Sequence, residues 1–141
     1  MLNEKYRVRE KTGVWRIVNP FLQETAHAIY PNIWLPSQHY RDYISGDPKP
    51  QTQRAIVHET KHLDRQTEIG LPKWYISYLL SSSFRLEEEL LAIKEEMKLS
   101  KENDFQIDLE FKAKWLSSWM YLWCVSKEDA TKILQQMWEA L

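Results

Sequence analysis

The sequence lacks several features that would assign it to a common protein class. Its single cysteine, Cys124, excludes an internal disulfide framework and a metal site built from several thiolates. No run of 18 apolar residues occurs, so we expect no membrane span and no membrane partner. The start, residues 1–7, is mostly polar and has no apolar run, so we expect no signal peptide. We therefore expect a cytoplasmic protein, or a virion protein if a phage encodes it.

The chain also has no large excess of positive or negative charge. The chain has 19 basic and 20 acidic residues, and no long block of like charge predicts a nucleic-acid partner. We also find no internal repeat, low-complexity stretch or linker in the 141 residues. This organisation predicts one domain over 1–141, with a core over 14–99 and a C-terminal helical part over 105–141.

Tryptophan, in contrast, is abundant, and hydrophobic spacing predicts mostly helices. The seven tryptophans are expected mainly in the core, with a partner surface as the alternative. Short strands are predicted at 14–18 and 28–35, the second interrupted by Pro31, and a loop at 45–50. The expected helices are listed in chain order: 52–68 with Thr52 as cap, 73–80, 84–99, 107–123, and a last one capped by Ser126 and Asp129. In the fourth, the stripe Phe111, Trp115, Trp119 and Trp123 is expected in the core. The fold class is therefore α+β, mainly helical with a small N-terminal antiparallel or mixed sheet.

The helix predicted at 52–68 carries the motif His-Glu-Thr-Lys-His at positions 58–62. Residues four apart lie on one face of a helix, so the imidazoles of His58 and His62 can converge on one ion. Glu59 lies about 100° round the helix, where its carboxylate can act as general base without binding the metal. The pattern predicts a Zn²⁺ site suited to metal-assisted hydrolysis. The alternative is an ordinary histidine pair on a solvated helix.

A catalytic zinc site needs a third protein ligand, and an acid downstream is the best candidate. Leu86, Leu90, Ile93 and Met97 form an apolar stripe on which Glu89 falls, and an acid there is costly unless it is paired or binds metal. Glu89 is therefore the predicted third ligand, and Glu88 is the reserve although it points away from the stripe. The competing explanation is that the run 87–89 only favours a helix N-terminus.

Several other residues are weaker candidates. Glu68 could act as a ligand only if the helix ended early, and Asp64 and Gln66 fit a supporting role or the helix surface. An electrophile for the oxyanion could come from His39 or from one of four tyrosines, and spacing selects none of them. The tyrosines are Tyr40, Tyr43, Tyr75 and Tyr78.

These segments resemble a small zincin of the gluzincin type. The segment 32–36 resembles the short edge strand of that group, 55–66 its active-site helix, and 85–92 the segment with the third ligand. The resemblance, which spans 28–97, implies a minimal zincin whose sheet packs on the motif helix. It also implies that Ile33, Trp34 and Leu35 accept an extended peptide by strand addition.

We accordingly expect a zinc-dependent metallopeptidase-like protein that cleaves a peptide or other amide bond. His58, His62 and Glu89 would hold Zn²⁺, Glu59 would be the base, and a peptide or protein would be the substrate. Proteins of this kind are found in bacteria and phages. The alternative is an inactive or weakly active zincin-fold structural protein, such as a virion or assembly component with protein assembly partners.

Overall fold

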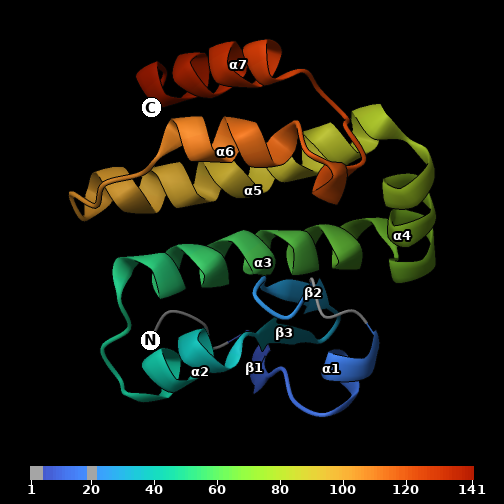
Figure 1. The fold of residues 1–141 in the computed structure, drawn as a ribbon, viewed down its shortest axis with the longest axis vertical. Helices are drawn as coiled ribbons and strands as arrows, with labels where there is room; N and C mark the ends of the chain where they lie inside the picture. The colour runs from blue at the N-terminus through green and yellow to red at the C-terminus, as the bar shows by residue number, and fades with distance from the viewer. Residues whose placement is uncertain (1–4, 19–21) are drawn as a thin grey trace. The chain divides into compact units, whose positions relative to one another are not determined.

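A computed structural model describes residues 5–18 and 22–141, and it confirms an α+β fold that is mainly helical with a small mixed sheet (Figure 1). The chain divides into two compact units, Met1–Glu68 and Ile69–Leu141, which we call unit 1 and unit 2. The boundary falls inside the stretch 14–99 that the sequence predicts as one core. Within the described ranges, no helix is long and apolar enough to cross a bilayer.

Unit 1 contains the three-stranded sheet. Its strands are β1 (Arg7–Glu10), β2 (His27–Ile29) and β3 (Asn32–Leu35), arranged in the order β1-β3-β2. β1 runs parallel to β3, and β2 runs antiparallel to it. The predicted break at Pro31 is confirmed, because the chain turns there between β2 and β3. β1 was not predicted, since two arginines and a glutamate obscure its alternating pattern.

The strand predicted at 14–18 is wrong, because this segment forms the short helix α1 (Val14–Val18). Gly13 precedes it with a φ of 56°, which turns the chain out of the extended conformation. The Trp15 amide then donates to the Thr12 carbonyl over 3.4 Å. The Trp15 ring lies 5.7 Å from the Trp34 ring, centroid to centroid. The β-branched residues thus indicated a strand where the preceding turn favours a helix.

Two helices complete unit 1, α2 (Ser37–Ile44) and the long motif helix α3 (Pro50–Ile69). α3 begins two residues before the predicted cap Thr52, which is instead buried inside the helix. Ile56 and Leu63 of α3 are fully buried in one cluster with Ile33 and Leu35 of β3. The expectation that the sheet packs on the motif helix is therefore confirmed.

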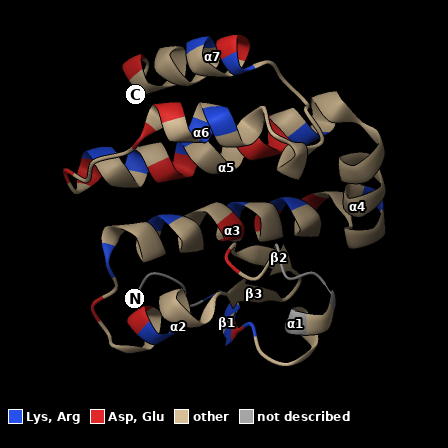
Figure 2. Ribbon diagram, viewed as in Figure 1, with Lys and Arg blue, Asp and Glu red and all other residues tan. Residues whose placement is uncertain are grey.

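Unit 2 begins with α4 (Leu71–Leu80) and α5 (Ser82–Glu102). Ser81 caps α5, accepting a hydrogen bond from the Phe84 amide over 3.2 Å. α4 carries only one charged residue, Lys73, whereas α5 carries many charges of both signs (Figure 2). Ile93 and Met97 of α5 belong to the buried core of unit 2.

The C-terminal part of unit 2 consists of α6 (Leu109–Leu116), the short 3₁₀ helix η2 (Trp119–Tyr121) and α7 (Lys127–Glu139). The predicted Ser126 cap of α7 is confirmed, since its hydroxyl accepts from the Asp129 amide over 3.1 Å. The predicted helix over 107–123 is too long, because α6 ends at Leu116. The expectation that its aromatic stripe lies in the core is also wrong: Phe111, inside α6, is 54% exposed, and Trp119 and Trp123, beyond its end, are 49% and 71% exposed.

Candidate metal centre

The two histidines of the motif lie together on α3. The Nε2 atoms of His58 and His62 are 3.1 Å apart, and the ring planes cross at 75°. Two imidazole nitrogens bound to one tetrahedral zinc at about 2.0–2.1 Å are separated by about 3.3 Å. His62 is only 5% exposed, while His58 is half-buried. The pair therefore has the spacing and the access that a shared metal ion requires.

Glu59 follows His58 on α3, and its side chain is buried at 8% exposure. A buried carboxylate needs compensating charge or hydrogen bonds. One nearby charge is Lys11: burial lowers the pKa of its ammonium, and the negative charge of Glu59 opposes that shift. A positive charge near the Glu59 side chain is one such compensation.

Lys11 is a residue of this region that sequence reasoning missed. It lies directly after β1, is 4% exposed, and donates from Nζ to the carbonyls of Leu22 and Thr25 and to Nδ1 of His27. The ammonium also lies 4.6 Å from the centre of the Trp15 ring. Burial lowers its pKa to about 8, although Glu59 opposes the shift. No spacing rule marks a lysine for such a position, because its acceptors come from a loop that only the fold brings near.

Two side chains of α3 fix the motif helix against the strands. The Gln66 amide donates from Nε2 to the Ala28 carbonyl and accepts from the Tyr30 amide, each over 3.1 Å. Asp64 accepts from Lys5 over 2.6 Å and from the Tyr6 hydroxyl over 2.7 Å. Burial acts to raise the pKa of Asp64, but these bonds outweigh it and hold the value below normal. Gln66 and Asp64 therefore orient α3 relative to the strands through hydrogen bonds.

The candidate acids in unit 2 lie on the buried face of α5. Glu88 is fully buried and Glu89 is 2% exposed. The buried face of α5 is therefore wider than its apolar stripe, so Glu88 is buried although it lies off that stripe. This face also holds Glu96, which pairs with Lys112 over 2.6 Å. Glu87, in contrast, is exposed.

Aromatic side chains of α4 donate hydrogen bonds to both Glu88 and Glu89. The indole Nε1 of Trp74 donates to Oε2 of Glu88 over 2.9 Å, and the Tyr78 hydroxyl donates to Oε1 of Glu89 over 2.5 Å. The two donor rings are themselves stacked, with centroids 4.8 Å apart. Hydrogen bonds of this kind orient carboxylates that bind metals. Tyr78 thus has an assigned partner that the sequence could not select from four tyrosines.

Arg85 fixes the end of α4 relative to α5. Its side chain is 4% exposed and donates from Nε to the Tyr121 carbonyl over 2.9 Å. It also donates to the carbonyls of Tyr78 and Leu79 at the C-terminus of α4, where a cation is favourable. The guanidinium therefore holds in place the residue whose hydroxyl contacts Glu89.

Two weaker candidates take other roles. Glu68 lies in the last turn of α3, is exposed, and pairs with Arg65 over 3.0 Å. The early helix end that it would need as a ligand does not occur. The Nδ1 atom of His39 lies 2.7 Å from the Thr52 hydroxyl, and burial lowers the pKa of this histidine. His39 therefore contributes to the contact between α2 and α3.

The predicted substrate strand is corrected by the sheet order. Ile33, Trp34 and Leu35 lie on β3, which is the central strand and pairs with β1 on one side and β2 on the other. Both backbone edges of β3 are therefore occupied, and Ile33 and Leu35 are fully buried. This segment cannot add a peptide strand, because the short, unpredicted β1 occupies the edge that a substrate would need.

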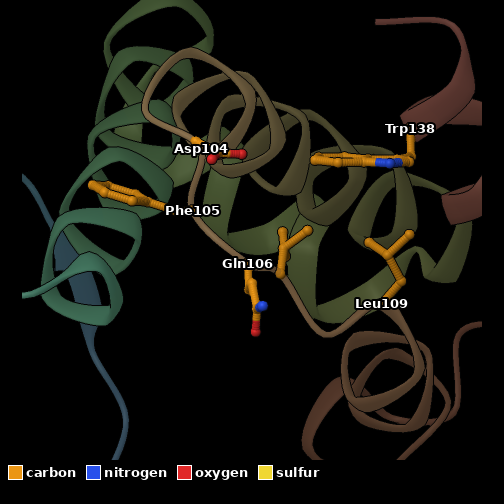
Figure 3. A pocket seen from close by; sticks show the side chains of 6 residues that line it. Asp104, Phe105, Gln106, Leu109 and Trp138 are labelled. Atoms are coloured by element: carbon orange, nitrogen blue, oxygen red, sulfur yellow. The ribbon is translucent and has the colours of Figure 1, made fainter.

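Each unit also has a surface hollow. The one in unit 2, about 380 Å³, is lined by Phe105, Leu109, Trp138 and three neighbours, with Asp104 as its one ionisable side chain (Figure 3). A single carboxylate provides no catalytic group set. The hollow in unit 1 measures about 630 Å³ and lies along β1. Neither lining includes a residue of the motif.

Comparisons with protein-family models, with curated proteins and with solved structures found no match to this chain.

Proposed function

We propose that the protein is a zinc-dependent hydrolase of peptide or other amide bonds. In this proposal His58, His62 and Glu89 bind the ion and Glu59 is the general base. The observation that carries the proposal is the 3.1 Å separation of the two Nε2 atoms on α3. Imidazole and carboxylate are the donors that catalytic zinc sites use, and three protein ligands leave the fourth position for substrate or water.

Glu89 is preferred to Glu88 for the third position. The alternative acid, Glu88, is fully buried and has its Oε2 atom engaged by the Trp74 indole. Glu89 has one oxygen oriented by the Tyr78 hydroxyl, and it is the acid that falls on the apolar stripe of α5, where binding a metal would offset the cost of its burial. The Tyr78 hydrogen bond fixes the carboxylate rotamer and so reduces the entropy lost when it binds a cation.

In the proposed hydrolysis, the zinc ion and Glu59 would have separate roles. A bound zinc ion supplies a Lewis acid that polarises the scissile carbonyl and makes water acidic enough to be deprotonated near neutral pH. Glu59, one residue after the first ligand, accepts that proton and passes it to the leaving amine.

The decisive experiment compares wild type with Glu59→Gln and Glu59→Asp, since both variants leave the proposed ligands intact. Each protein is loaded with zinc, its metal content is measured by plasma mass spectrometry, and cleavage of a mixed peptide library is followed by mass spectrometry. We expect about one zinc per chain in all three proteins, following from a three-ligand site. Cleavage should fall at least about a hundredfold in Glu59→Gln and less in Glu59→Asp, because only the glutamine variant lacks a base.

Two results would overturn the proposal in different ways. Zinc binding without cleavage by wild type would favour the structural alternative, a metal-holding assembly component with protein partners. Absence of zinc binding, together with unchanged stability of His58→Ala, would show that the motif is an accidental pair of histidines. Removing the metal with a chelator and restoring it separates loss of the ion from damage to the fold.

A further inference from the structure

The hollow of unit 1 follows the outer edge of β1. Four consecutive residues of this strand line it, Arg7 to Glu10, together with Tyr40 and Tyr43 of α2. Side chains of successive strand residues point to opposite faces. A hollow that touches all four in a row therefore reaches side chains on both faces of β1, and it also touches Trp34 of the neighbouring β3. Its volume of about 630 Å³ lies in the range of binding sites for a short peptide segment or a small molecule.

The backbone of β1 has groups that point into this hollow. The amides of Arg7 and Lys11 donate toward β3, to the carbonyls of Pro31 and Leu35, over 3.3 and 2.8 Å. In a parallel pair the direction alternates along the strand, so the amide and carbonyl groups of Val8 and Glu10 point away from β3. β1 is an edge strand, and these groups are placed to pair with an added strand.

The side chains around the edge set the chemistry of the occupant. Arg7 and Arg9 are exposed on one face of β1, and the second is held by a 3.0 Å hydrogen bond from Nε to Oδ1 of Asn32. Val8, Tyr40 and Tyr43 lie partly buried in the cluster on the other face. Among the described residues, no carboxylate forms an ion pair with either arginine. A strand added here would place acidic side chains beside the arginines and apolar ones beside the tyrosines.

We propose that this groove, defined by β1 with Tyr40 and Tyr43, binds an extended segment of a partner protein in which acidic and apolar residues alternate. Pairing with Val8 and Glu10 supplies main-chain hydrogen bonds, and Arg7 and Arg9 supply selectivity for acidic side chains. The site is separate from the proposed metal centre and does not depend on the proposed hydrolase activity.

The test measures binding of a fluorescein-labelled peptide, Glu-Val-Glu-Thr-Glu-Val-Glu, to the full chain by fluorescence polarisation. Two control peptides carry lysine in place of each glutamate, or N-methyl groups along one backbone edge. The protein variants are Arg7→Glu/Arg9→Glu and a matched control, Arg41→Glu, in which an exposed arginine of α2 outside the groove is reversed. Val8→Pro removes one outward amide, a substitution that edge strands tolerate, and Val8→Ala controls for the lost side chain.

We expect the acidic peptide to bind wild type and Arg41→Glu alike. The double reversal should weaken binding at least about tenfold, since it replaces two attractive charge contacts with two repulsive ones. The lysine and N-methyl peptides should bind at least about tenfold more weakly than the parent, and Val8→Pro should weaken binding more than Val8→Ala. If Val8→Pro does not fold, as judged by circular dichroism, the N-methyl peptide alone tests the backbone pairing.

The proposal is overturned if the acidic peptide does not bind, or if the double reversal and Arg41→Glu behave alike. Equal binding of the lysine peptide, or of a single-stranded oligonucleotide, would also overturn it. The peptide-binding test requires no zinc, so failure here and failure of the hydrolase proposal give different results.

Discussion

The two units present their candidate ligands in different ways. In unit 1, His58 and His62 face each other because one helix spaces them four residues apart. In unit 2, Glu88 and Glu89 are adjacent on α5, and each receives a hydrogen bond from a different aromatic residue of α4. Local geometry therefore arranges the histidines, whereas contacts between two helices arrange the acids.

This difference shows which half of a metal site a short motif can specify. A helix brings residues i and i+4 together whatever surrounds it, so the histidine pair needs only an intact α3. The choice between two neighbouring acids depends on which donors lie opposite them, and those donors are Trp74 and Tyr78. Mutations should therefore affect the two halves unequally.

The largest effect is expected from removing one ligand of each half. His62→Ala should abolish zinc binding, while Glu89→Gln should weaken it about a hundredfold or more but leave binding by the two histidines measurable. Both follow from the need for several strong donors in a zinc site. Isothermal titration with zinc measures both affinities, with His39→Ala as the control histidine. Equal loss in Glu88→Gln and Glu89→Gln would refute the assignment of the third ligand.

A smaller effect is expected from the aromatic donors. Tyr78→Phe removes the hydrogen bond to Glu89 but keeps the ring, and should weaken zinc binding about 10–100-fold, as loss of an orienting partner does. Trp74→Phe removes the bond to Glu88 and keeps an aromatic ring there, so it is the matched control. We expect it to lower stability and to change zinc affinity by less than Tyr78→Phe. If Trp74→Phe weakened zinc binding more than Tyr78→Phe, Glu88 and not Glu89 would be the third ligand.

The smallest effect concerns the pH dependence of unit 1. Burial lowers the pKa of Lys11 from 10.5 to about 8, so between these values the unfolded chain binds more protons than the folded one. The contribution of Lys11 to stability therefore rises with pH across this window, by about 1–2 kcal/mol from pH 7 to pH 9.5. Urea unfolding of wild type and Lys11→Met at both pH values measures it, and Lys49→Met, an exposed lysine, is the control. A pH response that Lys11→Met retains would contradict this account.

Much of the fold followed from the sequence where the signals were local. The Ser126 cap of α7 and the break at Pro31 lie where the sequence predicts them, and the motif helix α3 differs from its prediction only at its ends, where Thr52 is not the cap. Errors arose where the pattern was weak or misleading. The segment 14–18 is β-branched but helical after the turn at Gly13, and the charged residues of β1 concealed an edge strand.

The aromatic stripe over 107–123 failed for a similar reason. Spacing of four residues indicates a buried face only if one helix continues through all four positions. α6 ends at Leu116, and Leu122 and Trp123 follow with φ values of 53° and 49°, so the later tryptophans leave the helix face. Sequence periodicity could not reveal this, because the Ser117-Ser118 interruption is also compatible with a continuous helix.

The sequence by itself determined the histidine pair, the adjacent Glu59 and the α+β class, because helix periodicity and capping act over a few residues. Only the tertiary structure decided that β3 is central and β1 is the open edge, since strand order depends on contacts distant in sequence. It likewise decided the surroundings of Lys11 and the pairing of Glu88 with Trp74 and Glu89 with Tyr78. Burying a charge or a carboxylate is stable only beside its partners, and the fold alone brings those partners near.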